Sequence, residues 1–598
     1  MKSLLCILAT IMVVGGLRLP GTPPPSAPPT YDYIIAGGGL AGSLLANRLS
    51  ADPSKSVLLL EAGGADFENK FIKIPAGILR LFKSGFDWQH ETSGEHNCSG
   101  RNIFLARGKV LGGSSCTNVL LHHRGTAADY DNWNVPSWGA SDLLPYFKRT
   151  QGDLTGRAET NPAHHSTGGE WSMSEVRYQN PLSKRFLEVA GDQLGVNPDF
   201  NDWSSPQTGA GPFPVSERNG RRESGATAFL KPVLSRDNLT VRTGAMVRRI
   251  DWEGSTATGV TYDGGEGGVG DGLKAELRQG GEVICTAGAI ASPQLLMASG
   301  VGPREHLEEF NIPVISDLPG VGRNLQDHPA AVVSFSTPKK GVSVTSKLRI
   351  RGTKLTNPLP ILKWLFTRRG LLTSVGCDNG AFVKTDESKE QADLQIRFLA
   401  ARALGPDGMT TFTQFRNTRN HGDGYSFQAV ATRARSSGRV RLASSNTNVK
   451  PVIDGGYLSD ERDLDTLRNG LKLGRELGSK FGEYVGEEVF PGKACATDEQ
   501  LNKYIRDTLH TANALTGSCR MGTGADAVVD PDLKVRGVTG VRVCDSSIFP
   551  SIPGGQTGTP TVMVAERAAD FIINPEKAPS KMVNEVGGGV EQREVVGV

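Results

Sequence analysis

Hydrophobic and polar positions at the start of the folded region alternate between strand-like and helix-like patterns. Residues 31–36 form a short apolar run, which predicts a buried strand, and the residues that follow Gly42, to about residue 49, repeat apolar positions with a helical period. A second apolar run covers residues 56–60 and ends at Glu61. This strand–helix–strand order is typical of a βαβ unit, in which the two strands lie parallel.

Three glycines separate the first strand from the helix, at Gly37, Gly39 and Gly42. Gly37 permits a tight turn, Gly39 lets the backbone approach a pyrophosphate, and Gly42 lets the helix pack closely on the strand. The helix N-terminus offers free N–H groups and a partial positive charge to phosphates. Glu61 ends the second strand, where a carboxylate would accept from a ribose hydroxyl. The unit therefore predicts a dinucleotide-binding domain.

Later patterns are less regular. Residues 393–398 alternate polar and apolar side chains, which predicts a half-buried strand, and residues 359–366 predict an apolar helix. Residues 264–272 are rich in glycine and predict a flexible hairpin insertion, while the tail beyond about residue 574 predicts disorder.

Composition narrows the class of protein. A chain of 598 residues can bury a large core and form more than one domain. A net charge of +3 gives no indication of nucleic-acid binding, and no obligate protein partner is evident. The eight cysteines form no Cys-x-x-Cys pair and there is no His-Glu-x-x-His, so we expect neither a metal site nor a disulfide scaffold.

The N-terminal end resembles a targeting segment. Lys2 precedes an apolar run at residues 4–17, and a proline-rich linker follows at residues 20–29. The run resembles a secretory signal and is short for a membrane span. It is also compatible with the first half of a two-part signal into a plastid.

Three further segments carry a family resemblance. Residues 107–118 form a second glycine–serine loop, residues 288–302 form a Gly-Ala-Ile-Ala-Ser-Pro-Gln unit, and residues 543–561 run from Val-Cys-Asp to Gly-Thr-Pro-Thr. All three resemble the glucose–methanol–choline (GMC) oxidoreductases, and the likeness extends over residues 31–571. It implies FAD as the cofactor and a mixed α/β and α+β fold. A doubly wound, Rossmann-like FAD domain would be interleaved with a substrate domain that holds an antiparallel sheet.

The resemblance also implies boundaries and cofactor contacts. The expected units are a leader and linker at 1–30, a mainly FAD-binding part at 31–330 with interleaved substrate segments, a mainly substrate part at 331–500, a return to the FAD domain at 501–573, and a disordered tail at 574–598. The residues implied to hold FAD are Gly37, Gly39, Leu40, Ala41, Gly42, Glu61, Gly112, Gly113, Asn118, Val119, Leu120, Leu121, Val247, Asp545 and Gln556.

The position of the family's catalytic base is changed. The family pairs a histidine with a second histidine or an asparagine, and the matching positions here are Asn513 and Gln556. An amide has no useful pKa near neutrality, so neither residue can take a proton from an alcohol. His510 lies three residues upstream, where a helix would turn it to the same side. It is either a displaced base or a structural histidine.

A narrower resemblance is to the fatty acid photodecarboxylase branch of the family. Segments 371–383, 393–398 and 406–408 are similar to that branch, which implies catalytic roles for Cys377, Arg397 and Asn513. Cys377 and Arg397 would also bind the substrate, together with Gln428. Phe412 replaces a pocket tyrosine of that branch, so one hydroxyl hydrogen bond is missing.

The residue types suit a carboxylate substrate. Arg397 would place a permanent cation in an apolar tunnel, which is costly unless a partner neutralises it. A long-chain fatty acid supplies such a carboxylate; alternatively, Arg397 pairs with an acid of the protein itself. Cys377 is a weak hydrogen donor there, or a cysteine that only fills space.

The implied reaction is driven by blue light. The flavin is excited and takes one electron from the fatty carboxylate, CO2 leaves, and return of an electron and a proton or hydrogen atom to the alkyl radical gives an alkane or alkene one carbon shorter. The alternatives are an FAD-dependent alcohol oxidase or dehydrogenase of the same family, and a flavoprotein that binds lipid without turnover. The branch resemblance implies a plastid; a secreted protein is the alternative.

One segment predicts contact with a membrane. Residues 338–370 contain nine basic residues and no acidic one, around the apolar helix at 359–366. An apolar helix flanked by cations suits an anionic bilayer surface, and we expect it to cover the tunnel mouth. The alternative is a buried helix with a solvated basic face.

Overall fold

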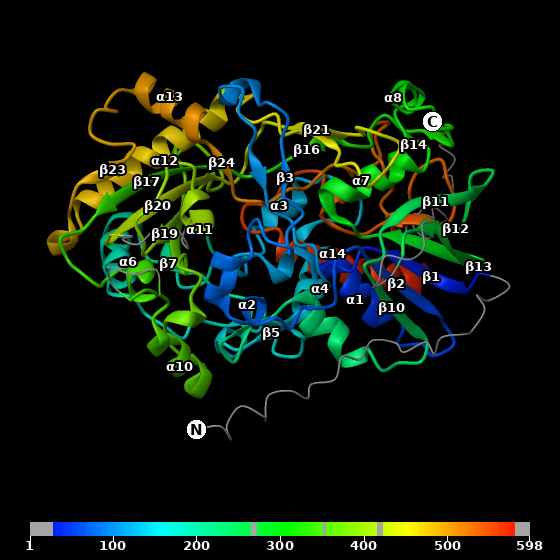
Figure 1. Cartoon of the computed structure of the whole chain (residues 1–598), viewed down its shortest axis with the longest axis horizontal. Helices are drawn as coiled ribbons and strands as arrows, with labels where there is room; N and C mark the ends of the chain where they lie inside the picture. The colour runs from blue at the N-terminus through cyan, green and yellow to red at the C-terminus, as the bar shows by residue number, and fades with distance from the viewer. Residues whose placement is uncertain (1–27, 265–271, 351–354, 415–421, 581–598) are drawn as a thin grey trace, which may run out of the picture.

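Two lobes lie side by side in the computed structural model, which describes residues 28–264, 272–350, 355–414 and 422–580 (Figure 1). The first lobe is built on a seven-stranded sheet in the order β10-β2-β1-β13-β12-β11, with β25 beside β13. Its strands are β1 (Thr30–Ala36), β2 (Val57–Glu61), β10 (Leu239–Thr243), β11 (Val247–Glu253), β12 (Thr256–Tyr262), β13 (Leu273–Cys285) and β25 (Val541–Val543).

The predicted βαβ unit is confirmed. β1 and β2 pair in parallel, and α1 (Leu40–Leu49) connects them. α1 packs on α14 (Gly558–Ile573), the long C-terminal helix, which in turn contacts α4 (Ala140–Thr150). The interior of this lobe is a continuous cluster of aliphatic side chains from β1, β2, α1 and α14.

The second lobe is an antiparallel sheet in the order β23-β17-β20-β19-β18-β7, with β24 beside β17. The fold class predicted from the sequence, a doubly wound domain joined to an antiparallel sheet, is therefore confirmed. Its strands are β7 (Gly209–Pro212), β17 (Pro329–Ser336), β18 (Asn379–Val383), β19 (Leu394–Leu399), β20 (Gly424–Ala431), β23 (Glu488–Phe490) and β24 (His510–Thr511).

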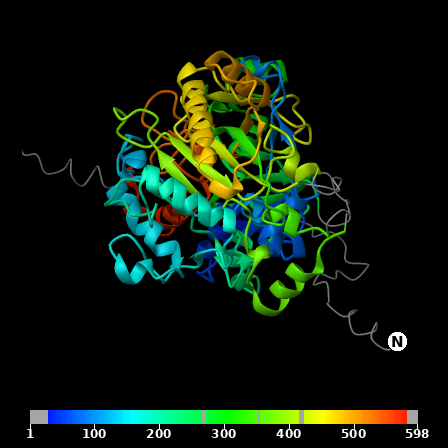
Figure 2. The same ribbon diagram turned by 90° about the vertical axis from the view of Figure 1, so that its left-hand side faces the viewer.

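Two helices cover the outer face of this sheet, α6 (Pro181–Leu194) and α12 (Glu461–Ser479) (Figure 2). Glycines allow the close approach of α12. A Cβ added at Gly470 would lie 2.6 Å from Ala429 Cβ, and one added at Gly478 would lie 2.5 Å from the Phe335 ring. The helix is thus packed directly on β20 and β17.

The strand predicted at residues 393–398 is present as β19 (Leu394–Leu399), but it is not half-buried as expected. β19 lies between β18 and β20, and both of its faces are buried. Leu394, Ile396 and Phe398 pack into the core under α12 and α6. Gln395 and Arg397 face the opposite side and are buried as well. The alternation of polar and apolar residues therefore does not mark a face exposed to solvent. The polar face of β19 is buried because it is directed toward an internal cavity.

The chain passes between the lobes several times. Residues 31–330 contribute to the second lobe as well as the first. Strand β7 belongs to the second sheet, and helix α6 packs on that sheet, so the two lobes are interleaved along the chain. The return to the first lobe begins later than residue 501, because α13 (Asp498–Thr508) packs on α12 and β24 pairs with β17.

Two predicted flexible segments have ordered flanks. β12 and β13 pair antiparallel with Tyr262 opposite Leu273, and residues 265–271 between them lie outside the described residues.

The predicted disordered tail does not begin at residue 574. Lys577 Nζ forms an ion pair with Asp570 at 3.0 Å, and the Ser580 N–H donates to Asp532 across 3.0 Å. These bonds attach residues 574–580 to the first lobe.

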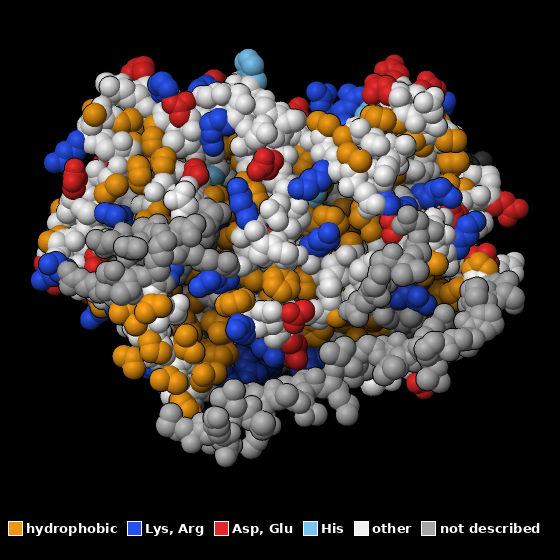
Figure 3. Space-filling view, in the orientation of Figure 1, with side chains coloured by type: hydrophobic (Ala, Val, Ile, Leu, Met, Phe, Trp, Pro, Cys, Tyr) orange, Lys and Arg blue, Asp and Glu red, His pale blue; other side chains and the backbone are white. Residues whose placement is uncertain are grey.

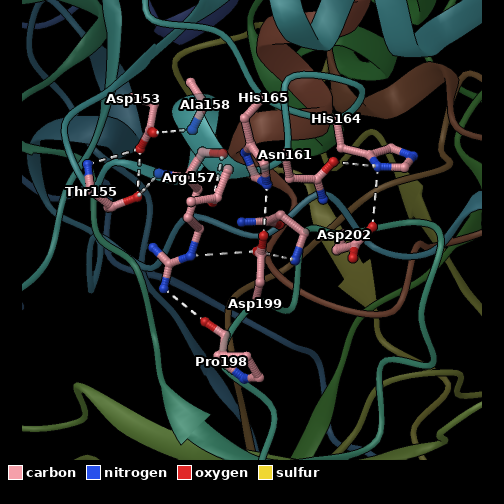
Figure 4. A network of polar contacts seen from close by, with 12 residues as sticks. Asp153, Thr155, Arg157, Ala158, Asn161, His164, His165, Pro198, Asp199 and Asp202 are labelled. Atoms are coloured by element: carbon pink, nitrogen blue, oxygen red, sulfur yellow. Dashed lines mark hydrogen bonds and ion pairs between the residues drawn. The ribbon is translucent and has the colours of Figure 1, made fainter.

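A polar network joins residues 153–165 to residues 198–202 (Figure 4). Asp199 accepts from His165 Nε2 at 2.7 Å and lies 3.8 Å from Arg157 Nε. His165 Nδ1 lies 3.0 Å from the Gln151 amide, which accepts from Arg124. Because Arg124 follows directly after His122 and His123, the network fixes the segment that leads into the site described below.

Replacing Asp199 by asparagine tests this network. Burial alone would raise the pKa of Asp199, but the hydrogen bond from His165 and nearby charges hold the pKa below its ordinary value of 3.8. The carboxylate therefore stabilises the fold above that pH, and the contribution is lost as pH falls through it. We expect Asp199→Asn to cost about 1–3 kcal/mol at pH 7 and progressively less below pH 4, measured by thermal unfolding.

The matched control is Glu159→Gln, which removes an exposed carboxylate from the same loop region. An equal loss of stability in the two variants would mean that the network contributes nothing.

Candidate cofactor and active site

The first glycine loop has the geometry that a bound pyrophosphate requires. Gly37 has a φ of +116°, and a Cβ there would lie 2.7 Å from the Thr286 carbonyl oxygen. A Cβ at Gly42 would lie 2.0 Å from the Gly37 carbonyl oxygen, so glycine is required for α1 to pack on the turn. A Cβ at Gly39 would meet protein only at 3.8 Å, from Thr286 O. The space over Gly39 is open, which suits a ligand that approaches the backbone.

Glu61 closes this site at the end of β2. Its two carboxylate oxygens accept from the Gly38 N–H at 2.8 Å and the Gly63 N–H at 2.7 Å. Burial raises the pKa of Glu61 to about 7. A ribose hydroxyl that donates to this carboxylate would favour its charged form.

The second glycine loop packs against the first. Gly112 and Gly113 both have positive φ, and a Cβ at Gly113 would lie 2.8 Å from Gly39 Cα. Asn118 fixes the following turn, because its side-chain oxygen accepts from the Leu120 N–H at 3.1 Å and from Arg222 Nη1 at 2.8 Å. The two loops therefore form one cradle.

Asp545 stands at the far side of this cradle. One carboxylate oxygen accepts from the Gly288 N–H at 2.8 Å and from Ser292 Oγ at 2.6 Å, and the other accepts from the Ser547 N–H at 2.8 Å. These bonds tie the start of α7 (Gly288–Ala298) to the turn that follows β25.

One continuous cavity runs from the cradle to the inner face of the second sheet. Gly42 and Gly112 do not line it; they shape the loops that do. Phe412 belongs to α11 (Thr410–Gln414), and its side chain lies outside the described residues. The predicted site residues that line the cavity are Gly37, Gly39, Leu40, Ala41, Glu61, Gly113, Asn118, Val119, Leu120, Leu121, Val247, Cys377, Arg397, Gln428, Asn513, Asp545 and Gln556.

Arg397 is the buried cation of this cavity. It projects from the centre of β19 and is 4% exposed. Its Nε donates to Gln395 Oε1 at 2.8 Å, and no carboxylate of the described residues lies within ion-pair distance. Burial lowers the pKa of the guanidinium, which still remains charged at neutral pH. An unpaired buried cation favours an anionic ligand.

The sheet register brings Gln428 and Cys377 to the same place. Arg397 lies directly opposite Gln428 on β20 and opposite Gly380 on β18. Cys377 precedes β18 by two residues and also lines the cavity. Burial raises the pKa of its thiol to about 12. Cys377 is therefore a neutral S–H donor beside Arg397 and not a thiolate.

Asn513 is held in a left-handed turn, with φ at +60°. Its side-chain oxygen accepts from the Ala106 N–H at 2.7 Å, and its carbonyl oxygen accepts from Arg107 Nη1 at 2.9 Å. The next residue is fixed too, since the Ala514 N–H donates to Asp327 across 2.7 Å. Asn513 thus lies in the cavity wall with its amide oxygen already occupied.

His510 does not lie on a helix, contrary to the sequence prediction. It belongs to β24, opposite Ala330 of β17. It reaches the cavity because of this strand pairing, and Asn513 does so because the chain turns after Thr511. The Gln428 amide nitrogen lies 2.8 Å from His510 Nε2. Gly408, with φ at +64°, leaves the space the ring needs, since a Cβ there would lie 2.3 Å from Nε2.

Sequence reasoning missed two members of the site, Gln395 and His123. Gln395 accepts from Arg397 and from the Gln556 amide at 3.2 Å, and Gln556 also contacts His123. Gln395 could have been found, because a residue two positions before Arg397 shares its face of a strand. His123 gave no signal in the sequence; it packs edge-on against Phe213.

None of the nearby histidines has a pKa that suits a base at neutral pH. His90 and His510 are the histidines that line the described cavity wall. Burial lowers the pKa of His90 to about 3 and that of His510 to about 4, where Arg397 adds to the shift. Burial also lowers the pKa of His123 to about 3. A general base works best with a pKa near the operating pH, so these rings are weak proton acceptors.

The described residues contain no group of three or more His, Cys, Asp or Glu side chains that could hold a metal ion. In the same residues, every helix is too short or too polar to span a bilayer.

Comparison with known proteins identifies the class. Sequence profiles of GMC oxidoreductases match residues 31–330 and 434–565. The chain belongs to the GMC oxidoreductase family, and its cofactor is FAD. The open cradle over Gly39 and Gly113 fits that cofactor, and the chain is a GMC flavoprotein.

Individual relatives refine the placement. The chain is 42% identical to the chloroplastic fatty acid photodecarboxylase of Chlamydomonas reinhardtii, over 93% of each protein, which places it with that branch. It is 36% identical to an alcohol dehydrogenase of Pseudomonas putida, over 91% of this chain and 96% of that one. Among solved structures, a formate oxidase shares 25% identity with a TM-score of 0.83 and covers 93% of this chain and all of its own.

The open space over Gly39 gives a test of the cradle. Because no protein atom would lie closer than 3.8 Å to a new Cβ, we expect Gly39→Val to fold but to lose bound FAD. The visible flavin absorbance of the purified protein should fall by at least about tenfold.

Gly64→Val is the matched control, since Gly64 is exposed, lies outside the cavity wall and has no neighbour within 4 Å of an added Cβ. Full flavin content in Gly39→Val would contradict the assignment of the cradle.

Proposed function

We propose that this flavoprotein decarboxylates long-chain fatty acids in a light-driven reaction. The observation that carries the proposal is Arg397, a buried guanidinium with no acidic partner among the described residues, in the same cavity as the cofactor cradle. The 42% identity to the algal photodecarboxylase supports it. Apolar side chains of Val332, Val375 and Leu399 line the cavity near Arg397 and suit an alkyl chain.

Each residue has a defined task in this reaction. Bound FAD supplies the chromophore for blue light and accepts one electron. Arg397 holds the substrate carboxylate by charge and hydrogen bonds. The protonated thiol of Cys377 donates a further hydrogen bond. The Gln428 amide oxygen and the Asn513 amide nitrogen hold substrate or water at the same end.

The proposed decarboxylation balances without a base. The bond between the carboxyl carbon and the alkyl chain breaks, CO2 leaves, and one proton takes its place on the alkyl carbon. A saturated acid gives an alkane and an unsaturated acid an alkene, with no net oxidation. Asn513 is compatible with this scheme, because no hydroxyl proton has to be removed.

Oxidation of an alcohol is the second candidate, favoured by the Pseudomonas putida relative and by His510 in the cavity wall. The low pKa of His510, about 4, argues against it. The two reactions differ in the dark, where an alcohol would bleach the flavin of an oxidase or dehydrogenase.

A plastid is the proposed location, on the strength of the chloroplastic relative. The apolar run at residues 4–17 lies outside the described residues. A fluorescent fusion that stays outside plastids in an algal cell would contradict this location.

The decisive assay compares hydrocarbon formed from palmitate in blue light and in darkness. We expect pentadecane only in light, and no bleaching by alcohols in the dark. Arg397→Gln should weaken palmitate binding by roughly 10–100-fold, because a charge-assisted hydrogen bond is lost, while FAD stays bound. Hydrocarbon formation at the unmodified rate in this variant would contradict the role of Arg397.

Cys377→Ser tests the thiol. We expect hydrocarbon formation to fall by at least about tenfold, since the hydroxyl is smaller and less polarizable than the thiol. Cys495→Ser is the matched control, because Cys495 is half-buried and lies outside the cavity wall. Equal activity in the two serine variants would exclude a role for Cys377.

A further inference from the structure

Exposed apolar side chains gather on one helix. Fourteen large hydrophobic residues are exposed in the described chain, and six of them lie between residues 350 and 366. Four belong to α10 (Pro358–Thr367), where Leu359 is 69% and Phe366 is 84% exposed. In the space-filling view they form an apolar patch at the position of α10 (Figure 3). We call Leu359, Leu362, Leu365 and Phe366 the apolar stripe.

The opposite face of α10 is anchored in the protein. Trp364 is buried, and its Nε1 donates to the Gly220 carbonyl oxygen at 2.7 Å. Ile361 packs against the core of the second lobe. The stripe therefore faces outward because the helix is fixed on its other side. No residue of α10 lines the cavity, so the expectation that it covers the tunnel mouth receives no support; Val375 is the first cavity residue after it.

Cations surround the C-terminal end of α10. The Arg368 guanidinium lies 4.2 Å from the centre of the Trp364 ring. Burial lowers the pKa of Arg368, and the nearby charge of Arg221 lowers it further. Arg177 is brought close to the helix end because its carbonyl accepts from the Gly370 N–H. None of these cations is within ion-pair distance of a carboxylate in the described residues. We call the following set the basic collar: Arg177, Arg221, Lys363, Arg368 and Arg369.

We propose that the apolar stripe and the basic collar dock this protein on the surface of an anionic lipid bilayer. An amphipathic helix that lies in the interface buries its apolar side chains among the acyl chains, while adjacent cations contact anionic headgroups. α10 has ten residues, far fewer than a bilayer span requires. The helix lies on the membrane and does not cross it.

Charge decides between a bilayer and a second copy of this chain. A two-fold interface through the stripe would bring the basic collar of one copy against that of the other. Segment 338–370 offers no carboxylate to compensate such a contact. An anionic lipid surface complements the collar, so it is the better occupant. The inference rests on this surface alone and stands whether or not the proposed reaction is correct.

The experiment is co-sedimentation of the FAD-loaded full chain with vesicles of phosphatidylcholine alone or with 30% phosphatidylglycerol. We expect binding to the anionic vesicles that is weakened by 0.5 M salt. Leu362→Glu combined with Phe366→Glu should reduce this binding by at least about tenfold. The matched control is Leu154→Glu with Ile573→Glu, at two exposed apolar positions elsewhere.

A second pair of variants tests the collar. Lys363→Glu with Arg369→Glu should reduce anionic binding by at least about tenfold, at roughly fivefold or more for each cation lost. Lys274→Glu with Arg323→Glu changes the net charge equally at exposed sites away from α10 and should bind normally. Trp364 is left intact, because its burial makes any change there a change of packing. Flavin absorbance confirms folding of every variant.

Two outcomes would overturn the inference. One is equal membrane binding by the α10 variants and their controls. The other is a dimer, seen by sedimentation velocity, that Leu362→Glu with Phe366→Glu converts to monomer, which would assign the stripe to a second copy of the chain.

Discussion

The site depends on one electrostatic constraint, a guanidinium buried at the centre of a sheet with no carboxylate of the described chain within ion-pair distance. Arg397 has a single hydrogen bond within the described chain, to its neighbour Gln395. Removing such a cation from water costs several kcal/mol unless an anion compensates it. The rigid sheet holds Arg397 in place because Leu394, Ile396 and Phe398 of the same strand are packed in the core beneath. The cost of this burial is offset when an anionic ligand binds.

The surroundings of Arg397 keep other groups neutral. Burial raises the pKa of the Cys377 thiol and lowers the pKa of His510, and the charge of Arg397 adds to the shift at the histidine. Each of these side chains is then a hydrogen-bonding group and not a base or nucleophile at pH 7. At its Arg397 end the cavity combines a buried permanent cation with neutral donors and apolar walls, which suits it to hold a carboxylate in a fixed position. It is poorly suited to take a proton from an alcohol.

Two independent devices bring these site residues to this point. Strand register places Arg397 beside Gln428, and pairing of β24 with β17 places His510 next to them. Asn513 arrives through a left-handed turn that Arg107 and Asp327 hold by hydrogen bonds to the backbone. The glycine cradle belongs to the first lobe, whereas Arg397 and Gln428 belong to the sheet of the second lobe. The cavity that contains both therefore forms only where the two lobes meet. The Asp199 network fixes Arg124 through His165 and Gln151, and with it the segment next to His123.

The sequence by itself determined the local elements and the cofactor. The βαβ unit, its three glycines and Glu61 follow from short-range rules, because turn geometry and helix–strand packing act between residues close along the chain. It also indicated the helix at 359–366 and a buried position for Arg397. Only the tertiary structure decided that β19 is buried on both faces, that His510 lies on a strand, that Trp364 points inward, and that Gln395 and His123 join the site. These outcomes depend on contacts between segments that are not neighbours along the chain, and such contacts leave no periodic trace in the sequence.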